Sequence, residues 1–152
     1  MEAEVQGYLD ELKIIKKQIL DVVQGLSEEA INWQPLPKDT NSIYAILTHL
    51  LGADDNWVKR VINRQSINRD REAEFRALGN PKGIMHRFEK VSKENENILS
   101  KLGSSQLRET RKVQIQQDER TVSVRWCILH VISHYALHLG HIQLTRQLWE
   151  QR

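Results

Sequence analysis

Residues 129–149, which read LHVISHYALHLGHIQLTRQLW, carry four histidines in one apolar segment: His130, His134, His138 and His141. Apolar residues recur around them at steps of three and four, and this spacing predicts a helix over residues 122–149. The same period continues through most of the chain, so the fold class follows from it.

Three further segments show the periodicity of amphipathic helices. We expect helices over residues 5–26, 43–63 and 82–102. The first spans about 22 residues before glycine and proline break it. Asn41 or Ser42 can cap the second, because short polar side chains accept hydrogen bonds from the first free backbone amides.

Two of the connections are long and polar. Residues 64–83 are predicted to form a crossover loop with one short helical turn. Residues 103–121 include RKVQIQQ, which can form a short extended piece. Loops of around 20 residues in a compact domain are often functional. The sequence therefore predicts an all-α protein, a four-helix bundle with long crossover loops, in a single domain over residues 1–152.

The composition excludes several classes of protein. The net charge is only +2, so a general nucleic-acid binder is not expected. No apolar run approaches the ~18–20 residues of a membrane span, and the acidic N-terminus does not resemble a signal peptide. We therefore expect a cytoplasmic protein that binds neither nucleic acid nor membrane. The single cysteine, Cys127, excludes an internal disulfide and is expected to be a buried apolar residue.

The histidine spacing permits a metal site but does not select its ligands. Residues three or four apart on a helix have Cβ atoms ~5–6 Å apart, so their imidazoles can reach one ion at ~2.0–2.1 Å. Residues seven or eight apart are separated by ~10–12 Å along the axis, which is too far. Three pairs remain: His130/His134, His134/His138 and His138/His141. A histidine-rich core helix without chemistry explains the spacing equally well.

A pair of histidines needs a further ligand from another helix. His49, in ILTHLLGADD, is the only histidine of the second predicted helix and lies at the edge of its apolar stripe. Taken alone, it is more simply a hydrogen-bonded core residue, but bundle cores build metal sites from facing helices. His86 has no such company and is expected at the surface.

The chain resembles the DinB/YfiT-like superfamily of metal-binding four-helix proteins over almost its whole length. GLSEEAINWQPLPKDTNSIYAILTHLLGADDNWV is similar to the first loop and second helix, and NRDREAEF to a loop found in part of the family. The closing helix of the family has HxxxH, one residue, Gly and usually Gln, which His134 and His138 match. The resemblance implies a divalent ion, zinc or nickel, on His49, His134 and His138. His141 stands where the family usually has Gln.

The resemblance also implies an activity. Three imidazoles leave a tetrahedral ion one open position for water or a thiol, and the family contains transferases that use thiols such as mycothiol or bacillithiol. We expect a metal-dependent transferase that joins a low-molecular-weight thiol to a small electrophile, with His141 and His130 as candidates to support the ligands. The alternatives are a metal-dependent hydrolase and a non-catalytic, stress-related dimeric binding protein.

Several polar residues beside these motifs are expected to be structural. Asp54 and Asp55 are candidates for a pocket carboxylate, but a solvated helix flank is the expected role. Arg69, Arg71 and Glu74 can hold an acidic cofactor, but local ion pairs are expected instead.

The partners expected from the resemblance are a small-molecule substrate and a second copy of the chain, because family members form homodimers through helix faces. The chain has four tryptophans that can lie at such an interface or in the core: Trp33, Trp57, Trp126 and Trp149.

Overall fold

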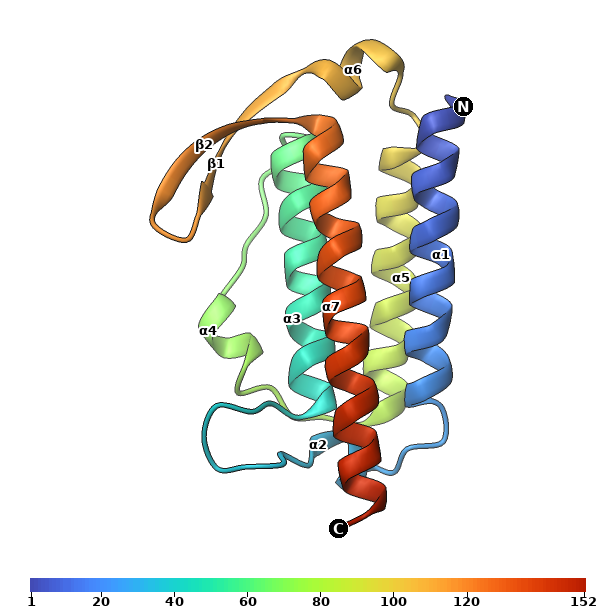
Figure 1. The fold of residues 1–152 in the computed structure, drawn as a ribbon, viewed down its shortest axis with the longest axis vertical. Coiled ribbons are helices and arrows are strands. Elements are labelled where there is room, and N and C mark those ends of the chain that lie inside the picture. Colours follow the sequence, from blue (N-terminus) through green and yellow to red (C-terminus); the bar gives the residue numbers. More distant parts are fainter.

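The computed structural model describes residues 1–152 as a bundle of four long helices (Figure 1). The long helices are α1 (Ala3–Val23), α3 (Ile43–Asp55), α5 (Pro81–Leu99) and α7 (Val124–Glu150). A π-helix, η1 (Asn56–Ile62), extends α3 to the end expected from the sequence. The all-α, four-helix-bundle prediction is confirmed.

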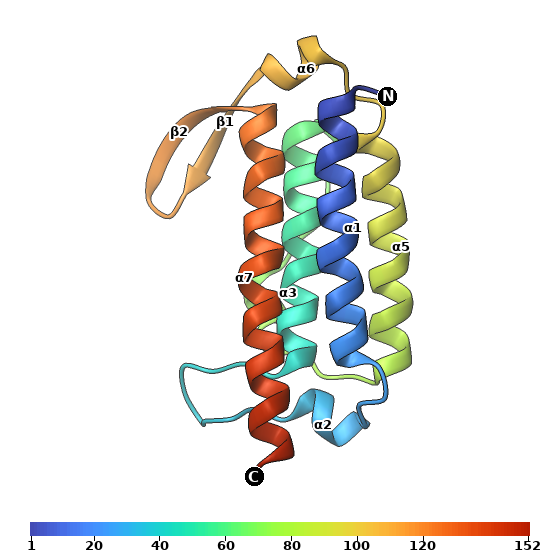
Figure 2. The ribbon, with the colours of Figure 1, turned by 45° about the vertical axis from the view of Figure 1, so that its right-hand side comes forward.

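The long helices do not alternate in direction. α3 and α5 lie side by side and run the same way, as do α1 and α7 (Figure 2). A chain that leaves the end of η1 must therefore return along the whole bundle before α5 can begin. Residues 63–80 make this return and contain the short helix α4 (Arg71–Glu74), so the predicted crossover loop with one helical turn is confirmed.

Polar caps set where the helices begin. The hydroxyl of Ser42 accepts a hydrogen bond from the amide of Ala45 at 3.1 Å, which starts α3. Ser123 accepts from the amide of Trp126 at 3.0 Å and starts α7 two residues later than expected. The sequence pattern extended this helix too far because Val122 is apolar but belongs to a strand.

A β-hairpin precedes α7, where the sequence suggested only one extended piece. After α6 (Ser104–Arg108), the strands β1 (Thr110–Ile115) and β2 (Asp118–Ser123) pair antiparallel. The hairpin folds back on the bundle through Arg111, which donates to the carbonyl oxygens of Val61 at 2.9 Å and Ile62 at 3.0 Å. These carbonyls end η1 and have no partner within it, so the hairpin caps that helix.

The core lies between the four long helices, and α2 (Glu28–Asn32) closes one end. α7 contributes the buried side chains of Val131, Tyr135 and Ile142. Cys127 is fully buried as predicted, and burial raises the pKa of its thiol to about 11, so it is protonated at neutral pH. No helix is both long and apolar enough to cross a membrane.

Candidate metal centre

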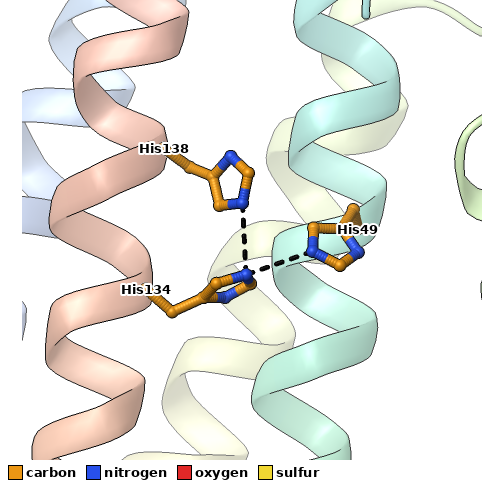
Figure 3. A group of neighbouring side chains, drawn as sticks. All are labelled: His49, His134 and His138. Carbon is orange, nitrogen blue, oxygen red and sulfur yellow. Dashed lines mark hydrogen bonds between the residues drawn. The ribbon is translucent and has the colours of Figure 1, made fainter. Parts of the chain in front are cut away.

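His49 on α3 and two histidines of α7, His134 and His138, point toward one another across the interface between the two helices (Figure 3). The Nε2 atom of His134 lies 3.1 Å from Nε2 of His49 and 3.1 Å from Nε2 of His138. One nitrogen from each of the three rings falls within 4.8 Å of the others. Two nitrogens held ~2.0–2.1 Å from one tetrahedral ion lie roughly 3.4 Å apart, so the spacing fits a shared ion.

Hydrogen bonding alone does not satisfy these three nitrogens. The Nδ1 atom of His49 lies 3.1 Å from Oε1 of Glu74 and donates to it, so Nε2 of His49 carries a lone pair. Nε2 of His134 can donate to one neighbour only. At most one of the three Nε2 atoms carries a proton, so at least two of them present lone pairs to their neighbours. A cation satisfies such a set.

The environment keeps these imidazoles neutral, as ligands must be. Burial, reinforced by the neighbouring histidines, lowers the pKa of His134 to about 3 and that of His138 to about 4. Burial also lowers the pKa of His49, although Glu74 acts in the opposite direction. The lone pairs are therefore available at neutral pH without the cost of removing a proton.

The crossover loop holds His49 in position. Arg69 donates from Nε and Nη2 to the two oxygens of Glu74, at 2.8 and 2.9 Å, while Glu74 accepts from His49. On its other side the ring of His49 stacks on Phe75, with centroids 4.8 Å apart. The predicted local ion pair of Arg69 and Glu74 is confirmed, but the sequence did not show that Glu74 also fixes the orientation of a candidate ligand.

His141 and His130 take different positions around this group. Nδ1 of His141 lies 3.2 Å from Nδ1 of His138, so it can accept the proton of that ring and leave Nε2 of His138 free. His130 makes no hydrogen bond to the group. Its ring stacks on Trp126, with centroids 4.8 Å apart, and lies parallel to that of His134 at 6.4 Å.

Comparison with known proteins identifies the family. The profile of the family described as mycothiol S-transferase matches residues 5–151. The chain belongs to the mycothiol S-transferase family. The DinB/YfiT-like resemblance is thereby confirmed. No curated protein matches the chain.

Solved structures share the fold of this mycothiol S-transferase family member at low identity. A conserved protein from Enterococcus faecalis has a TM-score of 0.82 and 12% identity, with 100% of this chain and 99% of that chain covered. A DinB-like protein from Bacillus cereus scores 0.74 at 14% identity, with 93% and 90% covered. YfiT from Bacillus subtilis, described as a probable metal-dependent hydrolase with an unusual four-helix-bundle topology, scores 0.75 at 12% identity, with 97% and 89% covered. At this identity the likeness establishes the fold.

A cavity opens beside the histidines of this mycothiol S-transferase family member. It has a volume of about 680 Å³ and includes His138 and His141 in its wall. The remaining wall is formed by Ile46 of α3, the loop after α2 and the last turns of α7, and its apolar members include Trp33, Leu36 and Leu148. This volume is typical of small-molecule sites.

Asp54 and Asp55, which the sequence predicted to form a solvated helix flank, lie outside the cavity beside the histidines. Asp54 is only 3% exposed, and its Oδ2 accepts from the hydroxyl of Tyr135 at 2.6 Å and from Lys16 at 3.2 Å, so the prediction was wrong for this residue. Asp55 is half-buried and pairs with Lys59 at 2.9 Å. Neither lines the cavity beside the histidines.

The other predicted residues are structural. Arg71 lies over the ring of Phe75, 5.3 Å from its centroid, and makes no ion pair with Glu74. His86 is exposed, as expected. The tryptophans pair within the chain, Trp33 with Trp149 at 5.7 Å and Trp57 with Trp126 at 5.8 Å between centroids.

Gly52 provides the room that Glu74 occupies. A Cβ atom at Gly52 would lie 1.9 Å from Oε2 of Glu74 and 3.1 Å from Nε of Arg69. We expect Gly52→Ala to displace the carboxylate from His49 and to weaken metal binding by about 10-fold or more. Competition with a zinc-binding dye measures the change, with Gly7→Ala, whose Cβ meets nothing within 4 Å, as the control. Unchanged affinity in Gly52→Ala would contradict the expectation.

The low histidine pKa values predict how the metal-free protein responds to acid. His134 and His138 bind protons in the unfolded chain below about pH 6.5, but in the folded chain only near pH 3 and 4. The part of the free energy of unfolding that depends on these two neutral imidazoles is therefore fully present above about pH 6.5 and is lost as the pH falls toward 4. Urea midpoints between pH 7.5 and 4.5 should fall more steeply in the wild type than in the double variant His134→Gln, His138→Gln. An equal change of the urea midpoint with pH in the two proteins would contradict the low pKa values of His134 and His138.

Proposed function

We propose that this chain is a metal-dependent transferase that joins a low-molecular-weight thiol to a small electrophile, with a divalent ion on His49, His134 and His138. The observation that carries the proposal is the convergence of three neutral imidazoles, one of which, His138, also lines a small-molecule cavity. The family to which the chain belongs supports a thiol as co-substrate. Imidazole ligands suit zinc and nickel, so these ions are the first to test.

The chain's own residues prepare the site for this reaction. Glu74 fixes the tautomer of His49, and His141 can do the same for His138, so both rings present Nε2 inward. When bound, the ion supplies a Lewis acid that lowers the pKa of a thiol or water in its open position. Phe75 stacks on one face of His49 and shields that face from water.

The side chains of the cavity wall favour a particular kind of electrophile. Its apolar members, Trp33, Leu36 and Leu148, suit the apolar body of an electrophile. In the transfer, the thiol sulfur forms a bond to the electrophilic carbon, and the bond from that carbon to the leaving group breaks with its electron pair. The thiol proton leaves the sulfur beforehand and passes to the solvent at the mouth of the cavity.

The test is thiol transfer to monochlorobimane, whose thioether product fluoresces. Zinc-loaded, nickel-loaded and metal-free protein are each assayed with mycothiol, bacillithiol and cysteine. We expect product with a metal-loaded form and at least one of these thiols, and none above the spontaneous rate in the metal-free form. Equal rates with and without metal would overturn the proposal.

A hydrolase is the alternative that the same geometry supports, since the open position can activate water as well as a thiol. The structurally similar YfiT is described as a probable metal-dependent hydrolase. Turnover of aryl esters by metal-loaded protein without added thiol would favour this reaction over S-transfer.

We also propose that the protein acts as a homodimer joined through the outer face of α7. That face carries no charged residue between Arg125 and Arg146. It presents two exposed leucines that do not line the cavity beside the histidines, Leu129 (47%) and Leu137 (57%). An exposed apolar stripe on one helix is typical of an interaction surface.

Leu137→Lys is expected to convert the dimer into a monomer, because two buried ammonium groups would face each other across the interface. Light scattering coupled to gel filtration measures the mass. Leu78→Lys, at a leucine 72% exposed on a different segment, is the matched control and should leave the mass unchanged. A dimer that survives Leu137→Lys would place the interface elsewhere.

A further inference from the structure

A second cavity lies between α1 and α5, two helices that carry none of the three candidate ligands. Its volume is about 310 Å³, which is at the lower end of small-molecule sites. Its walls are apolar side chains from both helices: Leu9, Leu12, Leu20, Phe88 and Leu99. The mechanism proposed above makes no use of this cavity.

The charges at the floor of the cavity balance one another. Lys16, with 13% of its side chain exposed, pairs with the buried carboxylate of Asp54 at 3.2 Å. Tyr135 donates to the same carboxylate oxygen at 2.6 Å. Exposed lysines and glutamates of α1 and α5 also line the cavity: Lys13, Lys17, Glu89, Lys93 and Glu96. A ligand therefore meets both signs of charge, and the buried charges of Lys16 and Asp54 are already paired with each other.

Two residues that line the cavity, Ser92 and Asn95, each have a buried polar atom with no hydrogen-bond partner in the protein. Asn95 is 1% exposed, and its Nδ2 donates to Oδ1 of Asp55 at 3.3 Å, which leaves Oδ1 of Asn95 as an acceptor without a donor. The buried hydroxyl oxygen of Ser92, one turn earlier on α5, also has no partner. Buried polar atoms are normally paired, so these two indicate a ligand that supplies the missing bonds.

We propose that this cavity binds a small, uncharged molecule with a hydroxyl group on an apolar body, such as a phenol or a cyclic alcohol. One hydroxyl can donate to Oδ1 of Asn95 and accept from the hydroxyl of Ser92. An ammonium group would meet Lys16, and a carboxylate would meet Asp54 and the Asn95 acceptor. The apolar walls take the body of the molecule.

The test is binding of 2-naphthol to the zinc-loaded protein, followed by amide chemical-shift changes in NMR spectra. Naphthalene, 2-naphthoate and 2-naphthylmethylammonium are the comparison ligands. We expect shifts in α1 and α5 around Lys16 and Ser92, and affinity for naphthalene and both ions at least about 10-fold weaker than for 2-naphthol. Shifts centred on His138 and Leu148 would overturn the proposal.

Ser92→Ala tests whether the ligand contacts the hydroxyl of Ser92 or binds through the apolar walls alone. Ser92 makes no hydrogen bond within the protein, so the variant should fold as the wild type does. We expect this variant to bind 2-naphthol about 2- to 12-fold more weakly than the wild type and to bind naphthalene with unchanged affinity. Ser104→Ala, at an exposed serine of α6, is the control. Equal affinity for 2-naphthol in wild type and Ser92→Ala, or no binding at millimolar ligand, would show that water alone serves these atoms and would overturn the proposal.

Discussion

His134→Ala is expected to reduce bound divalent metal from about one ion per chain to below about a tenth of that value. Nε2 of His134 lies 3.1 Å from both other ligand nitrogens, so it is the atom that joins the other two into one set. Without it, one imidazole from α3 and one from α7 remain, and a pair is an incomplete site for zinc or nickel. Mass spectrometry of the metal content measures the effect on untagged protein after loading and gel filtration.

The control for this experiment is His86→Ala, because His86 is exposed and lies apart from the cluster. Its metal content should equal that of the wild type. His49→Ala should behave as His134→Ala does, which would establish that the ion bridges two helices. A full complement of metal in His134→Ala would show that the ion binds elsewhere and would remove the basis of the proposed reaction.

Glu74→Ala is expected to weaken zinc affinity by about 10- to 100-fold while the three histidines remain in place. Glu74 is only 6% exposed and accepts from His49 and from both donor groups of Arg69. Its removal frees the ring of His49 to rotate and to change tautomer, and leaves Arg69 without its partner. Glu74→Gln retains an acceptor for His49 and should lose less zinc affinity than Glu74→Ala does.

Competition with a chromogenic zinc chelator at pH 7 measures the affinities, and thermal melting verifies that each variant is folded. Glu72→Ala is the matched control because Glu72 belongs to the same short helix and is exposed. If Glu74→Ala binds zinc as tightly as Glu72→Ala does, the carboxylate has no role in orienting His49.

Periodicity predicted the four long helices because each must bury one apolar stripe, and that requirement is local in sequence. The hairpin was harder to see. Its turn is Gln116-Gln117, and Gln116 adopts a positive φ of 56° without the glycine or asparagine that usually marks such a turn. The strand β2 is also largely exposed, so it carries no alternating apolar signal.

The sequence likewise predicted one part of the candidate site and did not predict another. Spacing on one helix limited the α7 ligands to three pairs, and the family resemblance selected His134 and His138. The role of Glu74 depends on a contact with His49 across 25 positions, and the burial of Asp54 depends on Tyr135 across 81 positions. Whether a carboxylate is solvated or buried is decided by partners that only the folded chain brings near it.

The parallel arrangement of α1 with α7 has a consequence for when the site comes into existence. The first long helix packs beside the last, and the last helix supplies two of the three candidate ligands. A nascent chain that has not yet produced α7 has an exposed core and only His49 in place. Because a domain folds as a unit, the ion can be acquired only after synthesis has passed the final helix. A three-histidine site therefore exists only after α7 has been synthesised and has packed beside α3.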